Sequence, residues 1–406
     1  MQKQNKGVLI AGAGPVGLCL TLKLLKEGIN VTLLECLSDE NFLDQIPRAG
    51  SNHAATLEMF DEIGLYEKLE PRGLIAPKFQ YRERKNNRLI AEFDHSVISE
   101  ETRFPFVLQC ERIKVIEEAM IMAKSHENCD VRMETTLLNF SQTEDKIMAT
   151  VRNSAGEEEQ IHSSFIVGTD GGRSVVRKGL GIDFEGFTYP DRVLNIIVAY
   201  DFTRDGFTDR NYVSDPDEWS NVFHWKGPPE VWRVHFPADP DAEDSSLTSE
   251  NALQGRLQAF LPAKQDYKII GCNLYTVHQR VASRFLGGRA IIAGDAAHVN
   301  SPIGGMGMNS GIHDAINLGE KLSSIFRGES ELESLERYER QRRHIALETV
   351  QAQTIRNKRV LAEKDLAIRE KNHDQLRRTA DDPLLAKEFI LRTSLINSVR
   401  EAAAIQ

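Results

Sequence analysis

The stretch that most constrains the fold is Gly12-Ala-Gly-Pro-Val-Gly17, a GxGxxG pattern directly after a short apolar run. The residues around it predict a strand over Gly7–Ala11, a helix over Pro15–Glu27 and a second strand over Asn30–Glu35. A glycine-rich turn between a strand and a helix is typical of a βαβ unit that binds a dinucleotide. We therefore predict such a unit at the N-terminus.

Each residue of this turn has a physical reason to be there. Gly12 permits the tight turn, Gly14 lets the backbone approach a pyrophosphate, and Gly17 lets the helix pack against the strand. Pro15 suits the first helical turn, where its missing N–H is no loss. Together with Val16 it starts a helix whose free amides and positive dipole end would face the phosphates.

Glu35 ends the second predicted strand. Its carboxylate could accept hydrogen bonds from both ribose hydroxyls of an adenosine, and it would repel a 2′-phosphate. The strand, the helix and the acid in register predict a bound adenine dinucleotide, with a merely tight structural turn as the alternative. This site by itself does not separate NAD from FAD.

Two further glycine-rich turns follow predicted strands. In Gly168–Arg177, Asp170 sits where a strand ends, and it could also simply cap the helix that follows. In Gly294–Asn309, GDAAHVNSPIGGMGMN, Asp295 ends a strand, and a helix is predicted shortly afterwards. Three such turns in this order indicate one extended nucleotide site more strongly than any turn alone.

The bulk composition excludes several classes of protein. A chain of 406 residues suggests two or three compact units, and the net charge of −10 argues against nucleic acid or an anionic membrane as a partner. The five cysteines show no CxxC and no metal-like spacing, so we expect reduced thiols, no metal site and a cytoplasmic protein. No apolar run is long enough for a membrane span.

The three motifs together resemble a known family. GxGxxG with Glu35, DGxxSxxR from Asp170, and GDAAH followed by PxGGxGxN are similar to the single-component FAD-dependent aromatic monooxygenases of the para-hydroxybenzoate hydroxylase type. Within that group the stretches Phe184–Arg192 and Val277–Arg280 most resemble the para-nitrophenol 4-monooxygenase and hydroxypyridine hydroxylase branch. Where the family often has Tyr-Glu-x-x-Arg-Arg-Pro, this chain has His344 in place of the proline.

The resemblance implies an α/β fold: a Rossmann-like FAD-binding domain, an inserted substrate domain built on a largely antiparallel sheet, and C-terminal helices. We expect the FAD-binding domain at 1–71, 109–181 and 286–330, and the substrate domain at 72–108 and 182–285. We expect a C-terminal helical region at 331–406, in which the basic excess over Arg337–Arg378 suggests a solvated helical face or a dimer contact. A monomer or a homodimer fits this layout.

The resemblance also implies a role for individual residues. FAD would lie extended, with its adenosine ribose on Glu35 and its ribityl chain on Asp295 and Gln109. Arg48 would reach the FAD phosphates, and Asp170 would touch FAD indirectly. The remaining predicted contacts to the pyrophosphate and the flavin ring come from two glycine turns: Gly12, Gly14, Pro15, Val16, Gly17, Gly305, Gly307, Met308 and Asn309.

Three residues are predicted to act in catalysis. His298 follows the GDAA turn and could take the proton of a phenolic hydroxyl, or it could form a structural hydrogen bond within the turn. Pro302 would shape the face that meets O₂, and Arg103 would pair with an anionic substituent unless it is a surface charge.

The chain shows no second GxGxxG, so NADH or NADPH is expected to bind only transiently, reduce FAD and leave. O₂ would then form a flavin hydroperoxide that hydroxylates a small phenolic ring, with nitrite release if the substrate is like para-nitrophenol. A hydroxypyridine or hydroxybenzoate hydroxylase, a non-oxygenating FAD-dependent reductase of the same fold, and a binding protein without turnover are the alternatives.

Overall fold

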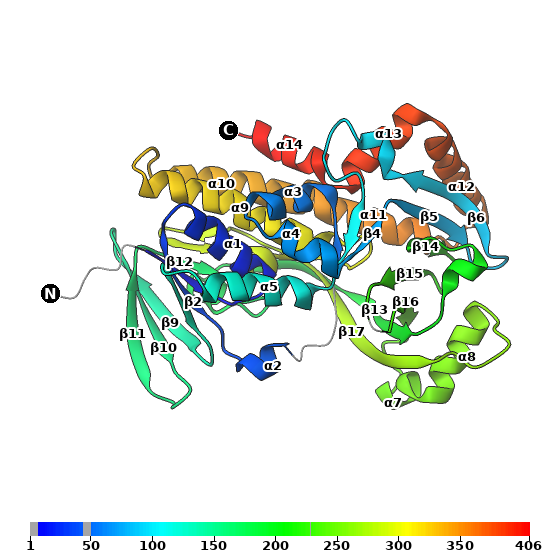
Figure 1. Ribbon diagram of the computed structural model, residues 1–406, viewed down its shortest axis with the longest axis horizontal. Coiled ribbons are helices and arrows are strands. Elements are labelled where there is room, and N and C mark those ends of the chain that lie inside the picture. The colour runs from blue at the N-terminus through cyan, green and yellow to red at the C-terminus, as the bar shows by residue number, and fades with distance from the viewer. Residues whose placement is uncertain (1–6, 44–49, 228) are drawn as a thin grey trace.

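The protein, a computed structural model, is described at residues 7–43, 50–227 and 229–406. Its two large sheets occupy opposite ends of the long axis in Figure 1. Long helices run over both sheets, and the chain ends among these helices. The architecture is therefore mixed α/β, as the sequence predicted.

The first large sheet has six strands in the order β18-β19-β12-β1-β2-β8, and all neighbours pair in parallel except β18 with β19. Its strands are β1 (Gly7–Ala11), β2 (Asn30–Leu34), β8 (Cys129–Arg132), β12 (Phe165–Gly168), β18 (Leu286–Gly287) and β19 (Ala290–Ile292). The three predicted glycine turns follow β1, β12 and β19, which are neighbours in the sheet. The carboxyl ends of parallel strands meet at one edge, so the turns are brought together.

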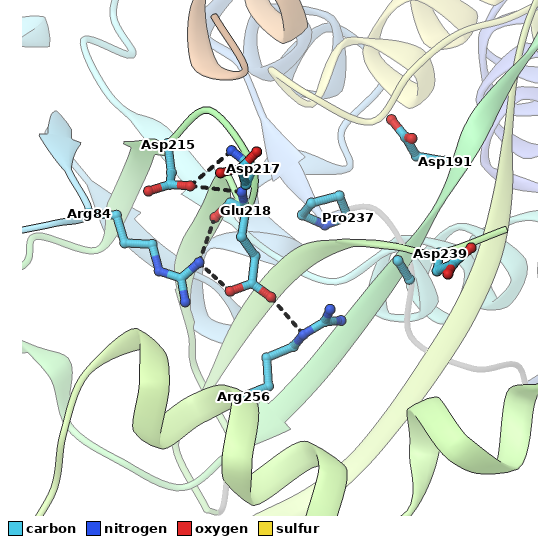
Figure 2. Close-up of a pocket in the computed structure, with 9 residues that line it drawn as sticks. Arg84, Asp191, Asp215, Asp217, Glu218, Pro237, Asp239 and Arg256 are labelled. Carbon is cyan, nitrogen blue, oxygen red and sulfur yellow. Dashed lines mark hydrogen bonds and ion pairs between the residues drawn. The ribbon is translucent and has the colours of Figure 1, made fainter. Parts of the chain in front are cut away.

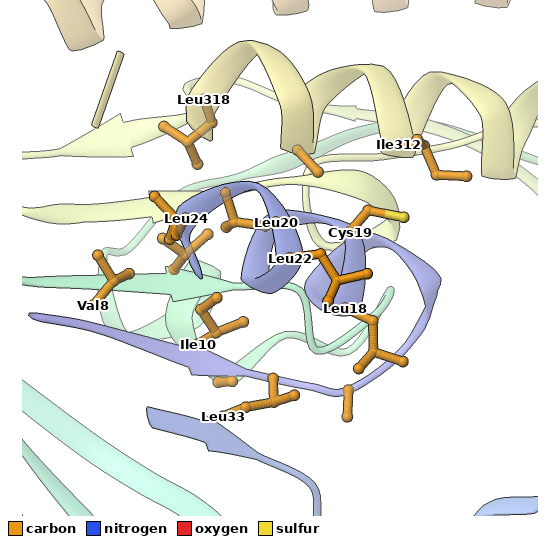
Figure 3. Close-up of a cluster of buried hydrophobic side chains, with 14 of the residues drawn as sticks. Val8, Ile10, Leu18, Cys19, Leu20, Leu22, Leu24, Leu33, Ile312 and Leu318 are labelled. Carbon is orange, nitrogen blue, oxygen red and sulfur yellow. The ribbon is translucent and has the colours of Figure 1, made fainter. Parts of the chain in front are cut away.

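The core of this end is built around α1 (Pro15–Lys26), which lies between the sheet and α9 (Met306–Phe326), as Figure 3 shows. Its leucines are buried on all sides, with Leu18, Leu20 and Leu24 fully inaccessible to solvent. A helix that is apolar all round is stable only when both faces are covered. Covering α1 with α9 therefore fixes the third glycine turn, which starts α9, over the first.

The second large sheet has eight strands in the order β20-β17-β13-β16-β15-β14-β5-β6. Its strands are β5 (Lys78–Glu83), β6 (Arg88–Asp94), β13 (Phe184–Val198), β14 (Arg210–Ser214), β15 (Ser220–Trp225), β16 (Val231–Ala238), β17 (Ile269–Ala282) and β20 (His298–Val299). All neighbours are antiparallel except β14 and β5. One face packs on an aromatic cluster under α7 (Asp244–Thr248) and α8 (Glu250–Phe260), and the other packs on a cluster that includes Ile303 and Met306 of the third glycine turn.

Two three-stranded sheets complete the β structure. One consists of β9 (Thr136–Gln142), β10 (Ile147–Arg152) and β11 (Glu158–Ser163). The other consists of β3 (Ser51–Asn52), β4 (Leu74–Ala76) and β7 (Val107–Gln109). The second one joins the two ends of the molecule, because β7 leads into α5 (Arg112–Lys124) and β4 leads into β5.

The remaining helices lie along the two large sheets (Figure 1). They are α2 (Asp39–Leu43), α3 (Ala54–Glu62), α4 (Tyr66–Leu69), α6 (Val175–Gly179), α10 (Ser334–His344), α11 (Ala352–Leu361), α12 (Leu366–Asp381), α13 (Pro383–Thr393) and α14 (Ile396–Ala404), with short 3₁₀ turns at Glu70–Arg72, His95–Ile98, Phe202–Asp205 and Gly294–Ala296. A π-helical segment, Ile345–Gln351, links α10 to α11. Among the described helices, none has the length and apolar character needed to cross a membrane.

The C-terminal region is more than a solvated face. Arg342 of α10 is 2% exposed and donates from Nε to Asp314 of α9 at 2.6 Å. Val350 and Ile390 are buried in the same cluster as Tyr212 of the eight-stranded sheet. The helices after Asn309 therefore complete the core between the sheets, and a solvated outer face or a dimer contact over Arg337–Arg378 stays a prediction. The division of the chain into domains at the stated boundaries stays a prediction.

Candidate functional site

The GxGxxG turn has the backbone geometry that its three glycines predict. Gly12 has φ +104°, a conformation open mainly to glycine. A Cβ on Gly17 would lie 2.0 Å from the carbonyl oxygen of Gly12, so helix and turn touch there. A Cβ on Gly14 would meet no atom within 4 Å, so the space above this residue is open to a ligand. No side chain caps α1, which leaves its first amides available. Val16 does not face this opening, because its side chain packs against Gly294 and Gly311.

Glu35 lies beside this turn and is 8% exposed. Its Oε2 accepts from the backbone N–H of Ala13 at 3.1 Å, and its Oε1 accepts from that of Leu37 at 3.1 Å. Each carboxylate oxygen can accept more than one hydrogen bond. The two amides thus aim the carboxylate, and it keeps acceptor capacity for the hydroxyls of a ribose.

Asp170 combines the two functions that the sequence left open. Its Oδ2 accepts from the N–H of Val175 at 2.7 Å, which caps the start of α6. Its Oδ1 is buried and has no hydrogen-bond partner among the described residues. Burial raises the pKa of Asp170 even though the amides of α6 oppose that change. The free oxygen is therefore an acceptor that a ligand or a bridging water would satisfy.

The third turn brings bare backbone to the same edge. Gly304 and Gly305 have φ +99° and +68°, and Gly305 starts α9 without any side-chain cap. A Cβ on Gly304 would lie 2.8 Å from Nδ2 of Asn357. Pro302 and Asp295 are both exposed at the surface of this turn, so neither is enclosed by protein. Their predicted roles toward O₂ and the ribityl chain stay predictions.

Asn309 holds this turn against β3. Its Oδ1 accepts from the N–H of His53 at 2.9 Å, and its Nδ2 donates to the carbonyls of Ser51 and Gly305 at 2.7 and 2.6 Å. The Asn309 side chain is thus fully used inside the protein. Met308 is 9% exposed within the core, and a Cβ on Gly307 would lie 3.2 Å from Oδ1 of Asn300. For these residues only the backbone is left to meet a cofactor.

Gln109 ends β7 and is fully buried. Its Oε1 accepts from the hydroxyl of Ser51 at 2.6 Å, while its Nε2 has no partner among the described residues. Arg48 lies outside the described residues. The free donor on Gln109 and the free acceptor on Asp170 are buried polar atoms of the kind that proteins rarely leave unsatisfied. They fit a cofactor with many polar groups, such as the extended FAD that the resemblance implies.

His298 is buried and is not among the residues that line the small pocket described below. It is 3% exposed, and its Nε2 donates to Oδ2 of Asp314 at 2.8 Å, with its ring 6.0 Å from that of Phe285. The structure therefore shows the structural hydrogen bond that was the alternative for His298, and a role of this residue toward the phenolic proton stays a prediction.

A small pocket lies where the third glycine turn meets the eight-stranded sheet. Gly304 and Met306 form one wall, aromatic and basic residues of the sheet and its flanks form the second, and Asn357 and Thr393 of the C-terminal helices form the third. The full lining is His53, Phe79, Tyr81, His95, Arg210, Tyr212, Gly304, Met306, Asn357 and Thr393. The free volume is about 20 Å³, room for one water, so an aromatic ring enters only when side chains move.

Both histidines of this pocket are held by backbone carbonyls. His53 donates from Nε2 to Gly304 at 2.9 Å, and His95 donates from Nδ1 to Pro77 at 2.8 Å. Burial, reinforced by the charge of Arg210, lowers the pKa of His53 to about 3 and that of His95 to about 4. Both rings are therefore neutral at physiological pH.

Arg103 is not part of this pocket. Its side chain is 75% exposed and forms an ion pair with Asp61 at 2.6 Å. This placement supports the surface-charge alternative for Arg103 over a pairing with an anionic substituent of the substrate. The arginine that does line the pocket is Arg210, which is 3% exposed.

A wider hollow on the eight-stranded sheet is unrelated to the motifs. Figure 2 shows that Arg84, Glu218 and Arg256 meet in it, with Nε of Arg256 2.8 Å from Glu218. Its volume is about 590 Å³, and four aspartates line it: Asp191, Asp215, Asp217 and Asp239. The charges pair with one another at an open surface, so this hollow lacks the closed apolar walls of an oxygenation site.

Sequence reasoning missed the pocket residues of the sheet. Phe79 and Tyr81 alternate on β5, and Arg210 and Tyr212 alternate on β14, so each pair lies on one face of its strand. The recurrence of these residue types at every second position was the available signal for a shared strand face. It was weak, because β14 is only five residues long and lies between loops.

Comparison with known proteins agrees with the motifs. The FAD binding domain family matches residues 5–353. The chain is 31% identical over 397 residues to para-nitrophenol 4-monooxygenase of Pseudomonas sp. (strain WBC-3), covering 97% of this chain and 96% of the relative. It is 29% identical over 359 residues to 6-hydroxy-3-succinoylpyridine 3-monooxygenase HspB of Pseudomonas putida, covering 87% of this chain and 88% of the relative.

The fold has a close counterpart among solved structures. The crystal structure of p-nitrophenol 4-monooxygenase PnpA from Pseudomonas putida DLL-E4 superposes with a TM-score of 0.90 at 30% sequence identity. The alignment covers 96% of this chain and 98% of that one. The predicted Rossmann-like fold with an antiparallel substrate sheet is thereby confirmed.

Proposed function

Since this chain belongs to the FAD binding domain family and has the fold of the flavin-dependent monooxygenases, we propose that it hydroxylates a small phenolic substrate, using O₂ and NADH or NADPH. The balanced reaction takes one reduced nicotinamide, one proton, O₂ and the substrate. It gives the hydroxylated ring, oxidised nicotinamide and water. Bound FAD supplies the acceptance of hydride and the activation of O₂.

One observation carries this proposal. The pocket joins bare backbone of the third glycine turn, at Gly304, to an aromatic sheet face that includes Tyr81 and Tyr212. The ring of Tyr81 stacks on that of Tyr212 with centroids 5.2 Å apart. If these side chains move apart, the aromatic walls beside the glycine turn would enclose an aromatic ring and exclude water, which would otherwise divert reduced flavin to H₂O₂.

The residues of the chain would divide the work of binding. Glu35 would hold the adenosine ribose, Gly14 and the first amides of α1 the pyrophosphate, and Asp295 with Gln109 the ribityl chain. Arg48 is proposed to reach the phosphates, and Asp170 to act through its free oxygen. His53 would fix Gly304 by its hydrogen bond, and the three walls of the pocket would orient the ring.

A para-nitrophenol-like substrate follows from the similarity to the two nitrophenol monooxygenases. Oxygenation at the nitro-bearing carbon would release nitrite and leave a quinone. The similarity to a hydroxypyridine enzyme supports a hydroxypyridine as the second candidate.

The test is turnover of purified, flavin-loaded protein. NADH and NADPH oxidation would be followed with para-nitrophenol, hydroxypyridines and hydroxybenzoates under ¹⁸O₂, with mass analysis of products and assays for nitrite and H₂O₂. We expect one labelled oxygen in the ring product of at least one substrate. Oxidation of NAD(P)H that yields H₂O₂ alone with every compound would overturn the hydroxylase and leave a non-oxygenating reductase.

A further inference from the structure

Arg210 stands out among the buried charges of this protein. Its side chain starts at the first residue of β14 and enters the pocket, where it is 3% exposed. Nη2 donates to the hydroxyl of Tyr212 at 3.0 Å, and this is the only hydrogen bond of the guanidinium to the described residues. Its Nε is buried and has no hydrogen-bond partner in the described part of the chain. The rings of Phe79 and Phe223 lie 5.7 and 5.8 Å from its central carbon.

Other buried arginines of the chain are compensated. Arg342 forms an ion pair with Asp314 at 2.6 Å. Arg82 and Arg177 each donate to two backbone carbonyls. Within the part of the chain that the structure describes, Arg210 has no carboxylate within ion-pair distance. A buried cation without a counter-ion is costly, so an anion is expected to complete this site.

The surroundings of Arg210 reinforce a preference for an anion. None of the described residues that line the pocket is acidic. Arg356 of α11 and Arg392 of α13 lie close enough to act on the Tyr81 hydroxyl beside it. Arg392 also has a buried Nε without a partner among the described residues. The pocket is thus lined or flanked by three guanidiniums, and its walls include the rings of Phe79, Tyr81 and Tyr212.

We propose that Arg210 is the substrate-recognising residue of this site, and that it binds the ionised oxygen of a phenolate, so the enzyme selects phenols in their deprotonated form. This inference rests on the proposed function. It assigns to Arg210 the anion-binding task that Arg103 does not perform. A guanidinium with two unoccupied donor groups matches a single anionic oxygen, and its rigid plane fixes that oxygen relative to the ring.

The protein groups that face Arg210 do not mask the titration of such a ligand. They are His53, His95, Tyr81, Tyr212, Arg356 and Arg392. Burial and Arg210 lower the pKa of both histidines to about 4 or below, so they stay neutral in the neutral range. Burial raises the pKa of Tyr81, so this hydroxyl stays protonated. Between pH 6 and 8 the affinity should therefore follow the ionisation of the ligand itself.

The experiment measures binding to the oxidised holoenzyme, followed by the flavin absorbance, with two ring-matched probes. Para-nitrophenol ionises, while its methyl ether, para-nitroanisole, does not. We expect the Kd of para-nitrophenol to fall as the pH rises through the pKa of the phenol and then to level off. The ether should bind weakly and equally at every pH.

The variant Arg210→Gln should raise the Kd of para-nitrophenol about 10- to 100-fold, the range for losing a hydrogen bond to a charged group. Its Kd for para-nitroanisole should change little, and the pH dependence should become flat. Arg210→Lys should keep part of the affinity because it keeps the charge. Arg103→Gln, at an exposed arginine, is the matched control and should bind both probes as wild type does. Flavin content and circular dichroism check that each variant is folded.

Two results would overturn the inference: an Arg210→Gln enzyme that binds para-nitrophenol as wild type does, or one that loses both probes equally. The proposed function fails separately. Arg210-dependent phenolate binding with H₂O₂ as the only product would remove the hydroxylase and keep this inference. Hydroxylation of phenols that is equally efficient in Arg210→Gln would do the reverse.

Discussion

His298 and Asp314 are joined by a buried hydrogen bond of 2.8 Å, and the same carboxylate oxygen accepts from the backbone N–H of Gly294 at 3.0 Å. Asp314 thus ties together the two ends of the GDAAH turn, with Asp295 between them. Arg342 approaches the other oxygen at 2.6 Å. Burial by itself would raise the pKa of Asp314, but His298 and Arg342 lower it to about 2, so the carboxylate is ionised.

Asp314→Asn should destabilise the protein and weaken FAD binding, because Arg342 would be left as a buried charge without its partner. The expected loss is about 3–5 kcal/mol of unfolding free energy, measured by urea denaturation. The double variant with Arg342→Met should recover part of that loss. Asp130→Asn, at an exposed ion pair, is the control. A double variant that is less stable than Asp314→Asn would contradict the role of Asp314 as the partner that compensates the charge of Arg342.

His298→Asn should lower FAD retention by loosening the turn and should not shift the pH profile of substrate hydroxylation. The reason is that its Nε2 is committed to Asp314 and the ring lies outside the pocket lining. Steady-state rates from pH 6 to 9, measured at saturating FAD, check this. Loss of a single ionisation from the profile, with normal FAD affinity, would restore His298 as the proton acceptor.

Gly14→Ala and Gly17→Ala should separate cofactor binding from folding. A methyl on Gly14 meets only open space, so the apoprotein should keep its stability while the affinity for FAD falls. A methyl on Gly17 would overlap the carbonyl of Gly12, so that variant should lose about 2 kcal/mol or more of stability as well. Thermal unfolding of the apoproteins and FAD titration give both quantities. An unchanged FAD affinity in Gly14→Ala would contradict the assignment of Gly14 to the pyrophosphate.

Stability should fall as the pH drops below about 6.5, where an unfolded histidine gains its proton. Burial, reinforced by Arg342, lowers the pKa of His313 to about 3, so this side chain stays unprotonated in the folded protein until the pH is far lower. Each such histidine lowers the free energy of unfolding by up to about 1.4 kcal/mol for each unit by which the pH falls in this window. Between pH 6 and 5 the slope of the free energy of unfolding against pH reports how many protons are taken up on unfolding. His313→Gln should lower that number by nearly one. His278→Gln, at an exposed histidine, is the control, and an unchanged slope in His313→Gln would refute the linkage.

The local predictions were accurate where one segment carries its own signal. The strands and the helix of the βαβ unit lie within one residue of their predicted bounds, because their apolar period and turn residues suffice. Helix α9 starts at Met306, inside the glycine-rich turn and not after it, although glycines lower helix propensity. Tertiary packing on α1 overrides that preference.

The sequence alone determined the family and the positions of the three glycine turns, with Glu35 beside the first, since each is encoded within a short stretch. Only the tertiary structure decided which charged residues meet. Arg103 and Arg210 are both arginines in unremarkable stretches, yet one is 75% exposed beside Asp61 and the other is buried in the pocket. His298 was likewise predicted to act on the substrate. The tertiary structure pairs it with Asp314 of α9, which is also paired with Arg342 of α10. Burial and partnership depend on long-range packing, which no local pattern encodes.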